Sequence, residues 1–265
     1  MSSRVLCACV SVLAFGGLAF ADDLPTPSPF GGASTLAGNT SSLAGSMIFE
    51  HGTETGSRYN PQSSPALPGG YTAANTIAFT NCVFDGGNTS AILDTLRFGI
   101  RQGGGSPDVD LRIFVGQMDT DGNLVTSSVA DLGVITLAGN GGTGFVTTVV
   151  DFAAGGYEVA MNDLAGSGNP GFSGFFVGMR FEGAGSTSNL NGWRITNAPA
   201  IGLAFNYFAA YDSTVPIAGN WSFSDPTPSY FYLDIEGTLV PAPGAIAMLG
   251  LAGLAGSRRR RGTDA

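Results

Sequence analysis

Residues 175–181 read F-F-V-G-M-R-F, and this stretch decides the fold class. Phe175, Val177, Met179 and Phe181 alternate with Phe176, Gly178 and Arg180. An alternation with a period of two puts apolar side chains on one face of a β-strand and smaller or polar ones on the other. The stretch therefore predicts a half-buried strand.

The same alternation recurs along the chain, at residues 96–101, 111–116 and 231–236. Shorter apolar runs add candidate strands at 76–84, 124–129, 134–137, 145–152 and 203–208. Clusters of Gly, Asn, Asp and Ser separate these runs, and the sequence shows no amphipathic helix between the two end segments. About nine short strands predict an all-β fold, an antiparallel β-sandwich of jelly-roll-like type, over residues 76–239.

The region before these strands has a different composition. Residues 22–75 are rich in Pro, Ser, Thr and Gly, with Pro25, Pro27 and Pro29 at alternate positions. Such a composition favours an extended chain over a packed one. We expect a partly ordered lead-in to the sandwich.

The charge balance excludes one class of partner. The chain has no lysine, and its 11 arginines face 20 acidic residues. Six arginines and 19 acids lie between the two end segments, so the net charge of that core is about −13. A surface of this sign repels phosphate backbones, and we expect no nucleic-acid partner.

Cysteine usage limits how the fold can be stabilised. Cys7 and Cys9 lie in the N-terminal segment, so Cys82 is the one thiol left after export. A single thiol allows no intrachain disulfide. Its strand-like flanks predict a buried, unreactive side chain, and the fold must depend on its apolar core.

The N-terminus has the three parts of a signal peptide. Arg4 is followed by an apolar run at residues 5–18, and then by Ala19, Phe20 and Ala21. The run is too short to span a bilayer, and small residues at Ala19 and Ala21 form an A-x-A cleavage site. We expect a signal helix over residues 1–21, which signal peptidase removes after Ala21.

The last 26 residues also have three parts. Val240-Pro241-Ala242-Pro243-Gly244 contains two prolines, which cannot lie in the interior of a sheet. An apolar run of about a dozen residues follows at 245–256, which is short for a membrane span of ~20 residues. Arg258, Arg259, Arg260 and Arg261 then hold the end on the cytoplasmic side. These features predict a short hydrophobic helix that inserts transiently into the membrane.

This layout resembles the PEP-CTERM sorting signal, in the variant that reads V-P-A-P-G-A. The resemblance covers residues 240–265 and implies recognition by a membrane-embedded transpeptidase of the exosortase type. It implies that the sorting motif consists of Val240, Pro241, Pro243 and Gly244 with the four arginines, and that the protein ends at the cell surface or outside the cell. The usual Glu between the prolines is Ala242 here, which implies a subtype of the partner enzyme. A plain C-terminal membrane anchor is the alternative.

One loop resembles the opening of a calcium site. Asp119, Asp121 and Asn123 place oxygen ligands at alternate positions around Gly122, as a hard cation requires. They are the candidate metal ligands, and calcium is the one candidate cofactor. The Glu expected at position twelve of such a loop falls on Ala130. A plain Asp-Gly hairpin turn explains the same residues without a metal.

Aromatic residues gather late in the chain, from Trp193 to Tyr232. Planar rings on a sandwich face can stack on sugar rings, so Trp193, Tyr211 and Trp221 are candidate glycan-stacking residues. Aromatic side chains also supply much of the burial in a β-sandwich core, which is the competing role.

No pattern in the sequence predicts catalysis. His51 is the only histidine, and no G-x-S-x-G motif accompanies it. Residues 103–105 and 139–144 are glycine-rich but open no helix, which predicts long hairpin loops rather than phosphate-binding loops. The leading hypothesis is an exported, non-enzymatic protein of the cell surface or extracellular matrix. The alternatives are a module that binds a surface polysaccharide, with or without calcium, and an extracellular hydrolase with paired carboxylates.

Overall fold

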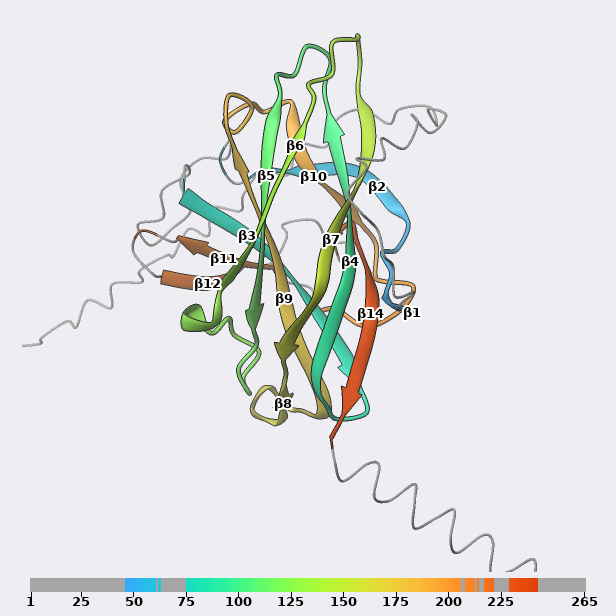
Figure 1. Cartoon of the computed structure of the whole chain (residues 1–265), viewed down its shortest axis with the longest axis vertical. Coiled ribbons are helices and arrows are strands. Elements are labelled where there is room, and N and C mark those ends of the chain that lie inside the picture. The colour runs from blue at the N-terminus through green and yellow to red at the C-terminus, as the bar shows by residue number, and fades with distance from the viewer. Residues whose placement is uncertain are drawn as a thin grey trace, which may run out of the picture.

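The computed structural model describes residues 46–60, 62, 75–205, 208–212, 214, 217–221 and 229–242. They form two antiparallel sheets packed face to face, so the chain is an all-β sandwich, as the alternating runs predict (Figure 1). The strands are β1 (Ser46–Phe49), β2 (Glu54–Tyr59), β3 (Thr76–Asp85), β4 (Asn88–Gln102), β5 (Val109–Gln117), β6 (Ala130–Leu137), β7 (Val146–Ala160), β8 (Asn162–Leu164), β9 (Asn169–Glu182), β10 (Asn191–Thr196), β11 (Phe208–Asp212), β12 (Ile217–Trp221), β13 (Tyr230–Phe231) and β14 (Leu233–Pro241).

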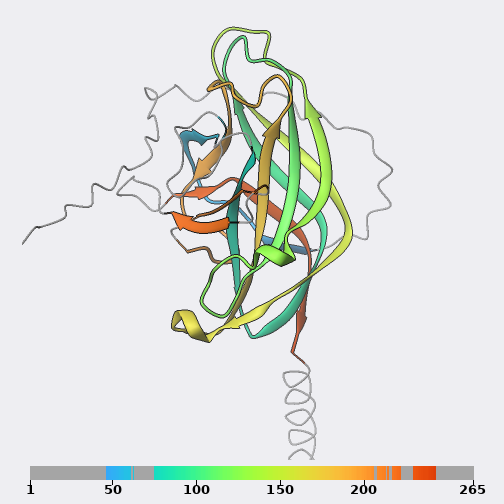
Figure 2. The same cartoon turned by 90° about the vertical axis from the view of Figure 1, so that its left-hand side faces the viewer.

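The strands divide between two sheets, which Figures 1 and 2 show from two directions. Sheet I runs β1-β14-β4-β10-β13, with β2 beside β10 and β7 beside β4. Sheet II runs β12-β11-β3-β9-β5-β6, with β8 beside β9. Many neighbouring strands are far apart in the sequence, such as β14 and β4 or β3 and β9, so long-range contacts contribute much of the stability of the sandwich.

Apolar side chains fill the space between the sheets. Phe175, Val177, Met179 and Phe181 of β9 point into it, and each is at most 1% exposed. Leu233 and Ile235 of β14 meet them from sheet I. The alternation predicted from the sequence is confirmed on this face. Burying each such side chain contributes roughly 1.5–3 kcal/mol to folding.

A second apolar cluster covers the outer face of sheet II. Phe176 lies there with Phe79 and Phe114, beneath Leu124 and Leu164 of neighbouring segments. Strand β9 is therefore buried on both faces. This double burial explains why its sequence is apolar at nearly every position, beyond what the alternation alone requires.

The sandwich begins earlier in the chain than the sequence predicts. Strand β1 pairs with β14 and β2 pairs with β10, so both belong to sheet I. The predicted boundary at residue 76 is too late, because β1 has only four residues and β2 is mostly polar, so neither shows an alternation. The rest of the predicted lead-in, residues 22–45 and most of 61–74, lies outside the described residues.

Other segments also differ from the prediction. Residues 124–129 contain an isolated bridge and a short 3-10 turn. Of the strand predicted at 203–208, the described residues show a bridge from Leu203 to Val83 and the first residue of β11 at Phe208. The glycine-rich loops at 103–108 and 138–145 are not hairpins. Each crosses from one sheet to the other, because β4 and β7 belong to sheet I while β5 and β6 belong to sheet II.

The two predicted end helices, at residues 1–21 and 245–256, lie outside the described residues. Within the described part of the chain, no helix has the length and apolar character needed to cross a membrane.

Candidate functional site

The last strand leads directly into the sorting motif. Val240 lies opposite Ser90 of β4, and Pro241 lies opposite Asn88. The hydroxyl of Thr89 donates to the carbonyl of Val240 at 3.3 Å. Strand β14 ends at the lower tip of the sandwich in both views (Figures 1 and 2). The folded domain therefore continues past the predicted boundary at residue 239.

Proline fits at this position because, among the described strands, none lies on the other side of β14 there. The pairing of β1 with β14 stops at Gly237, so Pro241 has β4 as its one described partner strand. A residue without an N–H is tolerated where a strand lies on an edge. The backbone N–H of Ala242 then donates to Gly87 at 3.3 Å, and Pro241 is exposed. Pro243, Gly244 and the four arginines lie outside the described residues.

His51 is joined to the last strand by an aspartate. Its Nδ1 lies 2.5 Å from Oδ1 of Asp234, and its backbone N–H donates to the same oxygen at 2.9 Å. The imidazole stacks on the ring of Tyr232, with centroids 3.5 Å apart. A carboxylate that orients an imidazole is one half of a general-base arrangement. Among the described residues no hydroxyl or thiol bonds to His51, so this contact links the N-terminal strand to the last strand.

Tyr232 is fixed in place by a glycine on the neighbouring strand. A Cβ added at Gly99 would meet the Tyr232 ring at 2.5 Å, so only glycine leaves room for the ring. Burial raises the pKa of the Tyr232 hydroxyl to about 12, and the negative charge of Asp234 adds to the effect. The phenol is therefore neutral at any ordinary pH.

The outer face of sheet I carries matched charges around this contact. Arg97 of β4 donates to Asp151 of β7 at 2.6 Å and approaches Glu236 of β14 at 3.9 Å. The hydrogen bond to Asp151 raises the pKa of Arg97, while burial opposes the rise. Arg194 pairs with Glu54 at 2.6 Å. These pairs connect neighbouring strands of sheet I.

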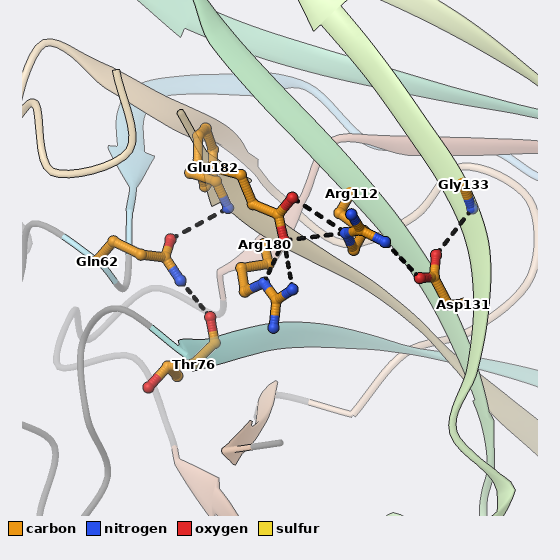
Figure 3. A network of polar contacts seen from close by, with 8 residues as sticks. Gln62, Thr76, Arg112, Asp131, Gly133, Arg180 and Glu182 are labelled. Carbon is orange, nitrogen blue, oxygen red and sulfur yellow. Dashed lines mark hydrogen bonds and ion pairs between the residues drawn. The ribbon is translucent and has the colours of Figure 1, made fainter. Parts of the chain in front are cut away.

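A comparable network lies across sheet II (Figure 3). Arg112 of β5 donates to Glu182 of β9 at 2.9 Å and to Asp131 of β6 at 2.6 Å. The hydrogen bonds that Arg112 donates to Asp131 and Glu182 raise the pKa of Arg112. Gln62 joins from the N-terminal region, donating to the carbonyl of Thr76. The ion pairs link β5, β6 and β9, and the bond from Gln62 ties a residue of the predicted lead-in to β3.

The candidate calcium ligands lie in a hydrogen-bonded turn. Oδ1 of Asp119 accepts hydrogen bonds from the backbone N–H of Asp121 at 2.9 Å and of Asn123 at 2.7 Å. Oδ1 of Asn123 accepts a bond from Asn220 at 3.0 Å. In the described ranges, no three His, Cys, Asp or Glu side chains come together as a metal site. The hairpin-turn interpretation accounts for this geometry, and calcium binding stays untested.

The candidate stacking residues fall into different environments. Trp193 is fully buried, stacks on Phe231 with ring centroids 4.2 Å apart, and donates from Nε1 to the carbonyl of Tyr232 at 2.8 Å. The prediction of a glycan platform at Trp193 is therefore wrong, because β10 points this ring into the core. Tyr211 is buried in the cluster outside sheet II. The backbone of Trp221 pairs with Phe208, and its side chain lies outside the described part.

Cys82 is fully buried in the main core, as predicted. Burial raises the pKa of its thiol well above the usual value, which keeps the sulfur protonated and unreactive.

No protein-family model matches the chain, and no curated protein matches it. Two solved structures show a distant likeness. One contains the cysteine protease and lectin-like domains of Cwp84, a surface layer associated protein of Clostridium difficile, with 13% identity and a TM-score of 0.35. The match covers 62% of this chain and 32% of that one. The other is a variant of the same clostridial protease after propeptide cleavage, with 12% identity and a TM-score of 0.35, covering 61% of this chain and 35% of that one. The chain spans about a third of the length of these structures, and so distant a likeness does not bear on function.

Proposed function

We propose that this chain is exported through its signal peptide and processed at its C-terminal sorting signal by an exosortase-type transpeptidase. The product is a non-enzymatic β-sandwich protein of the cell surface or extracellular matrix. One observation carries the proposal: the last strand ends inside the motif, and its final backbone contact is from Ala242 to Gly87. The recognition residues thus begin at the point where the folded domain ends.

This arrangement suits a processing enzyme. Residues up to Pro241 pair with β4 and Ala242 is hydrogen-bonded to Gly87, so a protease must peel the strand from the sheet to cut before that point. Cleavage after Ala242 leaves every strand contact in place. The mature domain then keeps its stability after the tail is removed, as an exported structural component must.

Two truncations test the proposal. A chain that stops after Ala242 keeps all described contacts of β14, so its melting temperature should match that of the full chain. A chain that stops after Leu239 loses the bonds to Thr89 and Gly87 and should melt lower. Both truncated chains lack the apolar run and the arginines of the sorting signal, so in the native host both should change location relative to the full chain. Unchanged location of the chain ending at Ala242 would contradict the proposal.

A second candidate function is saccharide binding. Trp193 is buried and cannot stack on a sugar ring, but a cleft lies at the end of the sandwich opposite the sorting motif.

A further inference from the structure

An open cleft lies where the loop at 138–145 crosses from β6 to β7. Its volume is about 430 Å³, within the range of roughly 300–1,000 Å³ typical of small-molecule sites. Among the described strands, β6 pairs only with β5 and β7 only with β4. The two free sheet edges therefore border the cleft, which opens into the space between the sheets.

The lining combines an apolar base with polar groups. Ile135 and Leu137 of β6 and Val150 of β7 supply buried apolar surface. Gln102 of β4 and Thr148 of β7 supply an amide and a hydroxyl. Mixed surface of this kind is typical of sites that bind a ligand through a few placed hydrogen bonds.

The Gln102 amide has unused hydrogen-bonding capacity. Its Nε2 donates to the carbonyl of Ala138 at 3.0 Å, and its Oε1 accepts from the hydroxyl of Thr148 at 3.3 Å. An amide offers two N–H groups and two lone pairs, so one donor and one acceptor remain. Gln102 is only 2% exposed, and incomplete hydrogen bonding of a buried polar group is costly. A ligand hydroxyl, which both donates and accepts, completes the set.

The charge of the residues that line the cleft limits the kind of ligand that it can bind. All 12 lining residues are neutral, in a chain whose formal net charge is −9. An anionic group buried here would find no counter-charge, and it would be repelled by the carboxylates of Asp110 and Asp108, which accept hydrogen bonds from Thr136 and Gly139 of the lining. The chemistry fits a neutral molecule rich in hydroxyl groups.

The backbone of β6 and β7 is irregular, which disfavours the binding of an extended peptide along their free edges. Gly133 in β6 has φ of +130°, and the pairing with β5 shifts register there. Gly155 and Gly156 in β7, with φ of +67° and +80°, accompany a second shift. Bulges of this kind bend an edge strand and interrupt the flat run that an added strand needs.

We propose that this cleft binds a neutral saccharide through Gln102 and Thr148. The site goes beyond export and processing, because saccharide binding holds whether or not the tail is removed.

The test uses the full chain on an array of neutral hexose oligosaccharides, with uronic-acid and sulfated oligosaccharides and extended peptides in parallel. Thr148→Val removes the hydroxyl at constant shape and should weaken neutral-saccharide binding by about tenfold or more. Thr147→Val is the matched control. It lies on the other face of β7, opposite Arg101 and outside the cleft lining, and should bind like the unaltered chain.

A second variant tests the site even if Thr148→Val disturbs folding. A Cβ at Gly141, which lines the cleft, meets no atom within 4 Å, so Gly141→Leu should keep the melting temperature and obstruct the mouth. Loss of binding in this folded variant supports the site. Three outcomes overturn it: no neutral saccharide binds, only charged saccharides or peptides bind, or neutral-saccharide binding survives both Thr148→Val and Gly141→Leu.

Discussion

The carboxylate of Asp234 binds His51 twice, through the imidazole at 2.5 Å and through the backbone N–H at 2.9 Å. The two residues are 183 positions apart in the sequence. Asp234 is 5% exposed, so its carboxylate depends on these bonds in place of water. The contact fastens the segment after β1 to β14, the strand that leads into the sorting motif.

Removing this carboxylate should destabilise the domain. Asp234→Ala leaves a partly buried backbone N–H without its acceptor, and we expect a loss of about 1–3 kcal/mol in the free energy of unfolding. Asp151→Ala is the control, because it breaks an exposed ion pair with Arg97 and should cost no more than ~1 kcal/mol. Urea denaturation measures both. An Asp234→Ala loss no larger than that of Asp151→Ala contradicts the role of the contact.

The raised pKa of Tyr232 predicts a sensitivity to alkaline pH. Its pKa is about 12 in the folded chain and about 10 when unfolded, so folding favours the neutral phenol. The stability that the neutral phenol of Tyr232 adds to the folded chain is fully present below pH 10 and is lost as pH rises through 12. Tyr232→Phe should therefore lose less stability than the unaltered chain between these values. Equal slopes of unfolding free energy against pH for the two proteins would rule out the effect.

Trp193 should behave as a core residue. Trp193→Ala removes a fully buried ring that stacks on Phe231, and we expect a loss of about 3–5 kcal/mol in the free energy of unfolding. Trp193→Phe keeps most of the ring and should cost less. Denaturation of the two variants distinguishes this role from that of a surface platform, whose loss would leave stability almost unchanged.

The Asp119 turn gives a direct test of calcium binding. Its Oδ1 is already occupied by two backbone N–H groups, so we expect millimolar calcium to leave the melting temperature unchanged. Asp119→Ala should lower the melting temperature with or without the ion, because it removes both acceptor contacts. A rise with calcium that Asp119→Ala abolishes would show that the loop binds the metal.

The sequence predicts correctly those features that depend on the residues of a single strand. The alternation in residues 175–181 identifies β9 and its core-facing side chains, and the lone Cys82 is correctly expected to be buried. The alternation in 231–236 likewise puts Asp234 and Glu236 on the outer face, which is the one signal for the polar contacts there.

What the sequence misses depends on distant partners. Strands β1 and β2 carry no periodic signal, and they are defined by their pairing with β14 and β10. Trp193 could not be assigned to the core until β10 was placed beside β4. The His51–Asp234 contact and the cleft at Gln102 each join segments that no local pattern connects.

The most direct test of the proposed export and processing is the intact mass of the mature protein from its native host, measured in the membrane, surface and medium fractions. We expect a chain in the surface or medium fraction that begins at Asp22 and ends between Ala242 and Gly244, at or just beyond the hydrogen bond from Ala242 to Gly87. A chain in the membrane fraction that retains Arg258 to Arg261 would contradict it and make the tail a plain anchor.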